Sequence, residues 1–113
     1  MGKLTTHVLD TVHGGPAAGV RIELWRLESG RALIGAIVTN ADGRGDKPLL
    51  EGDALLGGEY ELVFFVRDYF AGRGVASPFL NAVPVRFTVF DAAQNYHVPL
   101  LASPWAFSTY RGS

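Results

Sequence analysis

An all-β fold, an antiparallel β-sandwich of seven to eight short strands with one short helix, is predicted for this chain. Turn-forming residues interrupt the sequence at short intervals, as they do in sandwiches and barrels. The segments between them alternate apolar and polar residues, which is the period of a half-buried strand. With 113 residues, 48% hydrophobic and 19% charged, the chain is expected to form one compact domain over residues 1–113.

The first half of the chain supplies three strands and a less regular segment. Residues 4–12 form the first expected strand, which ends at a Gly-Pro turn. In residues 20–27, Val20, Ile22 and Leu24 share one face, as a half-buried strand requires. Residues 32–39 form a third strand, and the turn signal Asn40-Ala41-Asp42-Gly43-Arg44 ends it. A short strand is expected near Leu50.

The second half alternates strands with one helical turn. Strands are expected at residues 59–67, 83–90, 96–102 and 105–109. Residues 68–74 are expected to form the short helix of one or two turns, which Gly72 and Gly74 would end. Pro84 favours an edge position for its strand, since proline cannot donate a ladder hydrogen bond.

Composition excludes several classes of function. There is no cysteine, so disulfides, thiolate metal sites and a cysteine nucleophile are all excluded. A net charge of −1 does not fit a nucleic-acid-binding surface. Neither a signal peptide nor an apolar membrane span is recognisable, so we expect a cytoplasmic protein with no membrane partner.

Strand alternation separates two of the three histidines from the core. If Leu4 and Val8 face inward, His7 faces outward, and the same alternation places His97 outward on the strand at residues 96–102. That outward face would also carry Leu9, Pro99 and Leu101, and such apolar patches often mark interaction surfaces. His13 lies in a Gly-Pro turn and is expected to be a solvated loop residue.

These patterns alone do not identify a reaction. No glycine-rich phosphate loop, metal-ligand spacing or nucleophile elbow is present. From the residues alone, an ordinary surface or interface role is the more common one for such histidines, and a lone turn arginine such as Arg44 is most often solvated. The residue pattern therefore predicts a sandwich with an unusual outer face and leaves its purpose open.

Four sequence blocks resemble the hydroxyisourate hydrolase branch of the transthyretin-like family, and they span nearly the whole chain. The blocks are Leu4-Thr5-Thr6-His7-Val8-Leu9-Asp10 with Gly15-Pro16-Ala17, Asn40-Ala41-Asp42-Gly43-Arg44, Tyr96-His97-Val98-Pro99-Leu100-Leu101, and Ser103-Pro104 with Ser108-Thr109-Tyr110-Arg111-Gly112-Ser113. The Tyr-Arg-Gly-Ser ending is the most specific of these. In the hormone-carrier branch of the family the histidines and this tetrapeptide are missing.

The resemblance implies a homotetramer, a dimer of dimers, with active sites between the dimers. It implies hydrolytic opening of 5-hydroxyisourate, a purine-derived small molecule, with no cofactor and no metal. By resemblance, His7, Arg44, His97 and Ser113 are catalytic, with the acid and base roles of the histidines undecided. His7, Arg44, Tyr110 and Arg111 are the expected substrate-binding residues.

Two other functions remain open from the sequence. The chain could be a carrier that holds a small aromatic ligand between dimers, although the histidines and Arg44 argue against an apolar channel. It could also be an interaction domain whose apolar outer face docks another protein.

Overall fold

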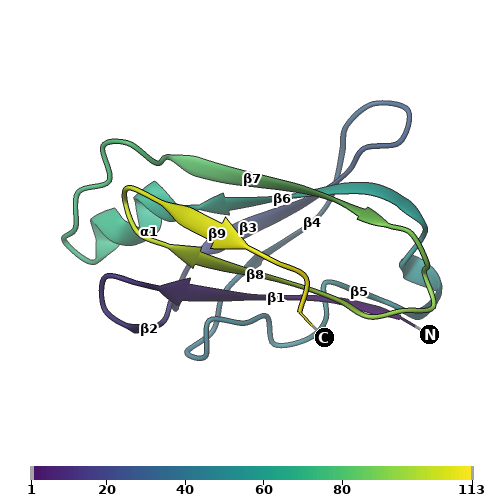
Figure 1. Cartoon of the computed structure of the whole chain (residues 1–113), viewed down its shortest axis with the longest axis horizontal. Helices are drawn as coiled ribbons and strands as arrows, with labels where there is room; N and C mark the ends of the chain where they lie inside the picture. The colour runs from purple at the N-terminus through teal and green to yellow at the C-terminus, as the bar shows by residue number, and fades with distance from the viewer. Residues whose placement is uncertain (1, 113) are drawn as a thin grey trace.

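Two β-sheets pack face to face in the computed structural model, which describes residues 2–112 (Figure 1). The first sheet has the strand order β2-β1-β8-β9, with β5 also paired to β1, and the second has the order β4-β3-β6-β7. The strands are β1 (Lys3–Asp10), β2 (Gly15–Pro16), β3 (Arg21–Arg26), β4 (Ala32–Val38), β5 (Leu50–Glu51), β6 (Gly58–Phe65), β7 (Ala82–Val89), β8 (Tyr96–Ala102) and β9 (Phe107–Thr109). A 3-10 turn, η1 (Gly52–Ala54), follows β5, and the one α-helix, α1 (Val66–Gly72), lies at one end of the sandwich (Figure 1).

The predicted sandwich is confirmed, but several elements differ from the expected bounds. The first strand ends at Asp10 rather than at residue 12, the helix covers Val66–Gly72 rather than residues 68–74, and the last strand covers only Phe107–Thr109. The helix begins at Val66, so the strand expected over residues 59–67 ends at Phe65. Val66 is buried on the helix instead of continuing the strand's inward face. The turn after β1 contains a two-residue strand, because Gly15 and Pro16 pair with the end of β1.

One pair of neighbouring strands, β1 with β8, runs parallel, whereas every other strand pair within residues 2–112 is antiparallel. In this register Thr5 lies opposite His97, and His7 lies opposite Pro99. The two histidines are therefore offset by two residues along adjacent strands. Since residues two apart share a face of a sheet, both rings emerge on the same side.

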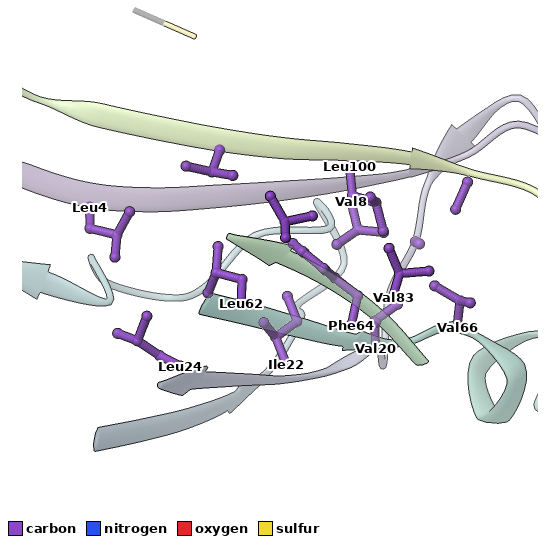
Figure 2. Close-up of a cluster of buried hydrophobic side chains, with 14 of the residues drawn as sticks. Leu4, Val8, Val20, Ile22, Leu24, Leu62, Phe64, Val66, Val83 and Leu100 are labelled. Carbon is purple, nitrogen blue, oxygen red and sulfur yellow. The ribbon is translucent and has the colours of Figure 1, made fainter. Parts of the chain in front are cut away.

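The core lies between the inward faces of the two sheets (Figure 2). Leu4, Val8 and Leu100 of the first sheet point toward Leu62 and Phe64 of the second, and all five are at most 2% exposed. Burying a side chain of this size stabilises the fold by roughly 1.5–3 kcal/mol. This packing fixes which face of β1 and β8 looks outward.

The second sheet carries an ion-paired outer face. Glu61 of β6 is 4% exposed and accepts hydrogen bonds from Arg31 at 2.9 Å and Arg86 at 2.8 Å. The bond from Arg86, aided by Arg31, holds the pKa of Glu61 below its ordinary value against the opposing effect of burial. The Arg31 guanidinium also lies 3.6 Å above the Trp25 ring.

His13 is an exposed turn residue, as expected, but its ring also bonds to a buried carboxylate. Its Nδ1 is hydrogen-bonded to Asp10 Oδ2, which also accepts a bond from the Tyr69 hydroxyl at 2.7 Å. Burial raises the pKa of Asp10, but the bonds from Tyr69 and His13 outweigh it and lower the value. Burial, together with the Asp10 carboxylate, raises the pKa of Tyr69 to about 12. The turn after β1 is thus anchored on a buried carboxylate that connects it to α1.

No helix within residues 2–112 is long and apolar enough to cross a membrane.

Candidate active site

His7 of β1 and His97 of β8 lie side by side on the outward face of the first sheet. Their ring centroids are 6.5 Å apart and the rings are tilted by 37°. Both residues are half-buried, as are Leu9 and Leu101 on the same face, while Pro99 is buried. The apolar neighbours are thus less open than expected, but they surround the imidazoles with a partly dehydrated surface.

The turn at residues 40–44 carries Arg44 to this pair. Asn40 closes the turn, since its side-chain oxygen accepts hydrogen bonds from the backbone N–H groups of Asp42 and Arg44. Gly43 has a φ of +74°, and an added Cβ would lie 2.5 Å from the carbonyl oxygen of Val8, so only glycine fits here. The Val8 N–H donates to the Gly43 carbonyl at 2.8 Å, and Arg44 forms a backbone bridge with His7.

The site is electropositive. Burial lowers the pKa of His97, and the neighbouring Arg44 and His7 lower it further. Within residues 2–112 Arg44 forms no ion pair with a carboxylate. Its charge therefore stays available to an anionic or strongly polarised ligand, and His97 is held neutral near pH 7.

Thr5 belongs to the same cluster, although the sequence patterns did not single it out. Its Oγ1 lies 2.9 Å from His97 Nδ1, directly across the parallel strand pair. The signal that could have identified Thr5 is its position two residues before His7, on the same outward face. Using that signal requires the register between β1 and β8, which no local pattern supplies.

The chain's last described residues run along β8 and contact His97. The Gly112 N–H donates to the His97 carbonyl at 2.7 Å. A Cβ on Gly112 would lie 2.6 Å from the imidazole Cδ2, so glycine lets the backbone pass directly against the ring. In Figure 1 this tail leaves β9 and runs back beside β8.

The structure does not bring Arg111 to the histidine pair. Its guanidinium lies 4.5 Å from the ring centroid of the buried Tyr96 and donates to the Asn95 carbonyl at 2.7 Å and to Gln94 at 3.0 Å. Because Gly112 pairs with His97, alternation turns Arg111 to the opposite side of the strand. Arg111 therefore holds the tail rather than facing the imidazoles.

Tyr110 and Ser113 are the other two site residues expected in the tail, and the structure describes only Tyr110. Tyr110 is 58% exposed and borders a groove of about 310 Å³ between the edge strands β7 and β9, which Phe87 and Phe90 also line. Ser113 lies outside the described residues. Its catalytic role stays a prediction.

A smaller groove of about 230 Å³ lies beside the histidines, between β1 and residues 44–49. Thr5, Arg44, Asp46 and Lys47 are among the residues that line it, so two cations and one carboxylate border one small cavity. No three His, Asp or Glu side chains group as metal ligands anywhere in residues 2–112. The groups available here are imidazoles, a guanidinium and hydroxyls, which suit proton transfer and carbonyl polarisation.

Comparison with known proteins places the chain in a family. Residues 4–112 match the HIUase/Transthyretin family. The chain belongs to that family. It is 56% identical to "5-hydroxyisourate hydrolase 2" of Rhizobium meliloti over 99% of this chain and 97% of the relative. It is 55% identical to a 5-hydroxyisourate hydrolase of Deinococcus radiodurans, over 97% of this chain and 95% of the relative. These relatives identify the chain as a hydrolase.

Solved structures repeat the fold in proteins with different names. An (S)-allantoin synthase structure matches with a TM-score of 0.95 and 49% identity over 99% of this chain, which spans 44% of that longer chain. The 5-hydroxyisourate hydrolase of Klebsiella pneumoniae matches with a TM-score of 0.84 and 35% identity, over 100% of both chains. Sea bream transthyretin in complex with thyroxine has a TM-score of 0.89 at 26% identity, over 97% of this chain and 94% of the other. Backbone similarity therefore does not separate a hydrolase from a thyroxine-binding protein, and the distinction depends on side chains.

Proposed function

We propose that this chain hydrolyses 5-hydroxyisourate to 2-oxo-4-hydroxy-4-carboxy-5-ureidoimidazoline, a ring-opening step in urate degradation. The observation that carries the proposal is the cluster of His7, His97 and Arg44 on one outward face, where Arg44 forms no ion pair within residues 2–112. The names of the relatives that share half or more of the sequence support the same substrate.

The reaction requires a base, hydrogen-bond donors and a proton source from the protein. A water oxygen attacks a ring carbonyl, so a base must accept a proton from that water. Negative charge develops on the carbonyl oxygen and needs hydrogen-bond donors. The ring C–N bond then breaks, and the leaving nitrogen must receive a proton. Water is split between the new carboxyl group and that nitrogen.

His7 and His97 supply the proton transfer and one of the donors in this proposal. Imidazole changes charge near neutral pH, so it can accept and return a proton under physiological conditions. Arg44 stays charged and presents a planar set of donors, which suits it to orient the substrate and stabilise the carbonyl oxygen. No metal or organic cofactor is required for these steps.

The tail completes the site. Tyr110 and Ser113 are proposed to contact substrate or water, and Arg111 to fix the tail through Tyr96, Gln94 and Asn95. Gly112 then carries the backbone past the His97 ring.

Assembly into a homotetramer of two dimers is part of the proposal. The edge strands β7 and β9 border the larger groove, whose aromatic lining suits burial against a second copy. Packing of two such dimers across the first sheet would enclose the histidines. Light scattering tests this directly, since the expected mass is four times the 12.2 kDa of one chain. Cytoplasmic location stays a prediction.

An absorbance time course with freshly generated 5-hydroxyisourate tests the activity. Enzyme is expected to accelerate the decay well beyond the spontaneous rate, in proportion to enzyme concentration. A carrier or an interaction domain would leave the spontaneous rate unchanged, and that result would overturn the proposal.

A further inference from the structure

We infer that Thr5 is a positioning residue that fixes the His97 ring with its proton on Nε2, so that His97 acts as a neutral hydrogen-bond donor while His7 is the base. This inference rests on the proposed function for its catalytic meaning. The geometry of Thr5 and His97 can be tested without any turnover.

The contact is built into the sheet. Thr5 and His97 occupy opposite positions of the parallel β1–β8 pair, so their side chains leave the backbone on the same face. The 2.9 Å separation of Thr5 Oγ1 and His97 Nδ1 is a normal hydrogen-bond length. Threonine has few χ1 rotamers in a strand, so the hydroxyl has little freedom to leave this position.

Which of the two groups donates this hydrogen bond follows from the other partners available to the Thr5 hydroxyl. Among residues 2–112, Nδ1 is the only hydrogen-bond partner of the Thr5 hydroxyl. A half-buried hydroxyl that donated nowhere would leave its proton unpaired, and unpaired donors are rarer than unpaired acceptors. Thr5 O–H therefore donates to Nδ1, which requires the neutral ring to carry its proton on Nε2.

The surroundings favour the neutral ring over the charged one. The charged or titratable groups acting on His97 are Arg44 from the turn at residues 40–44 and His7 from β1, and neither is acidic. Among residues 2–112 no carboxylate bonds to His97 Nδ1, unlike the arrangement in a serine hydrolase. A histidine in this setting resembles the neutral imidazole that polarises a carbonyl in triosephosphate isomerase.

The two histidines are consequently unequal. Within residues 2–112 the His7 ring has no hydrogen-bond partner, so both its nitrogens are available to water and substrate, whereas His97 presents only Nε2. His7 takes a proton from the attacking water and delivers it to the leaving nitrogen. His97 Nε2–H and Arg44 hold the carbonyl oxygen while charge develops. His97 gains and loses no proton in this cycle.

Two matched variants of the full-length chain test the role of Thr5. Thr5→Val keeps the side-chain shape but removes the hydroxyl, and Thr5→Ser keeps the hydroxyl. Nitrogen-15 NMR of the histidine rings, assigned with His7→Asn and His97→Gln, reports which nitrogen of His97 is protonated. Titration of the His97 ring protons reports its pKa.

The expected result is an Nε2-protonated, neutral His97 in the wild-type protein at pH 7. In Thr5→Val the pKa of His97 rises, because the bond that favours the neutral ring is lost, and in Thr5→Ser it stays at the wild-type value. Turnover falls by about 10-fold in Thr5→Val with KM nearly unchanged, and Thr5→Ser restores it.

A proton on Nδ1 in the wild-type protein would overturn the inference, and this reading needs no variant to fold. The inference would also be overturned if Thr5→Val kept both the wild-type turnover and the wild-type pKa of His97. If the wild-type protein fails to hydrolyse 5-hydroxyisourate but His97 shows the expected tautomer and titration, the proposed function fails while the role of Thr5 in fixing the ring stands.

Discussion

The outward faces of the two sheets use arginine in opposite ways. On the second sheet, Arg31 and Arg86 both bond to Glu61, so their charges are neutralised within the chain. On the first sheet, Arg44 lies beside two imidazoles and is paired with no carboxylate among residues 2–112. Ion pairs on the second sheet contribute to the stability of the fold, whereas the charge of Arg44 on the first sheet is available to bind a ligand. Sequence composition, with a net charge of −1, hides this difference.

Removal of the tail should have the largest effect on the first face. A chain ending at Thr109 loses the Gly112 contact with His97 and the Arg111 anchor over Tyr96. We expect activity to fall to the spontaneous rate while the oligomer measured by light scattering persists, because these residues follow the last strand and the groove at the proposed interface keeps Phe87 and Phe90. Full activity in the shortened chain would break the proposed link between the tail and the site.

Loss of either histidine of the pair should follow in size. His97→Ala and His7→Ala are each expected to lower turnover by roughly 10²–10⁴-fold, the range for a group that transfers a proton or donates a hydrogen bond to a developing oxyanion. Steady-state decay of 5-hydroxyisourate measures this. Unchanged decay in His97→Ala would contradict its assignment.

His13 provides the matched control for those variants. Because it bonds to Asp10 and lies outside the pair, His13→Ala is expected to lower the free energy of unfolding by about 1 kcal/mol and leave turnover unchanged. Urea denaturation and the same decay assay distinguish the two kinds of histidine.

A comparison of arginines tests the contrast between the faces directly. Arg44→Ala is expected to lower kcat/KM by roughly 10²–10³-fold, as for loss of one donor to a developing oxyanion. Arg21→Ala removes an exposed arginine of the second sheet, paired with Glu23 at 3.1 Å, and should leave the rate unchanged. Equal losses of kcat/KM in Arg44→Ala and Arg21→Ala would contradict the proposal that only the arginine of the first sheet acts on the substrate.

The smallest expected effect is on stability and belongs to the second face. Glu61→Gln should lower the free energy of unfolding by about 1 kcal/mol at pH 7, since the partner arginines are well exposed and screened. The pKa of Glu61 is depressed by folding, so its contribution is present above the unfolded value and is lost as pH falls through the folded one. The difference in the free energy of unfolding between the two proteins should therefore shrink as pH falls below the ordinary range of a glutamate. A difference that persisted at pH 2 would point to packing rather than charge.

Much of this molecule could be predicted from local patterns, and the limits have a physical origin. Alternation placed His7 and His97 outward because β1 and β8 each bury one face, as Leu4 and Leu100 show. The parallel pairing of β1 with β8 involves segments about ninety positions apart, which no short-range pattern encodes. Thr5 became visible as a partner of His97 only through that register.

The orientation of the tail residues could not be predicted from local patterns either. Alternation from Tyr110 to Gly112 can be read from the sequence, but which of these residues face the histidines depends on how the tail pairs with β8. The bridge between Gly112 and His97 decides it and turns Arg111 toward Tyr96. Arg44 was identified by family resemblance, because nothing in a solvated turn sequence indicates that it lies against His7.

The most direct test of the contrast between the two faces is an NMR titration with urate, the unoxidised relative of the proposed substrate. Shifts are expected at His7, His97 and the Arg44 turn, and should vanish in Arg44→Ala. Shifts centred on Glu61 and Trp25 of the second sheet would contradict the assignment of the first face as the binding site.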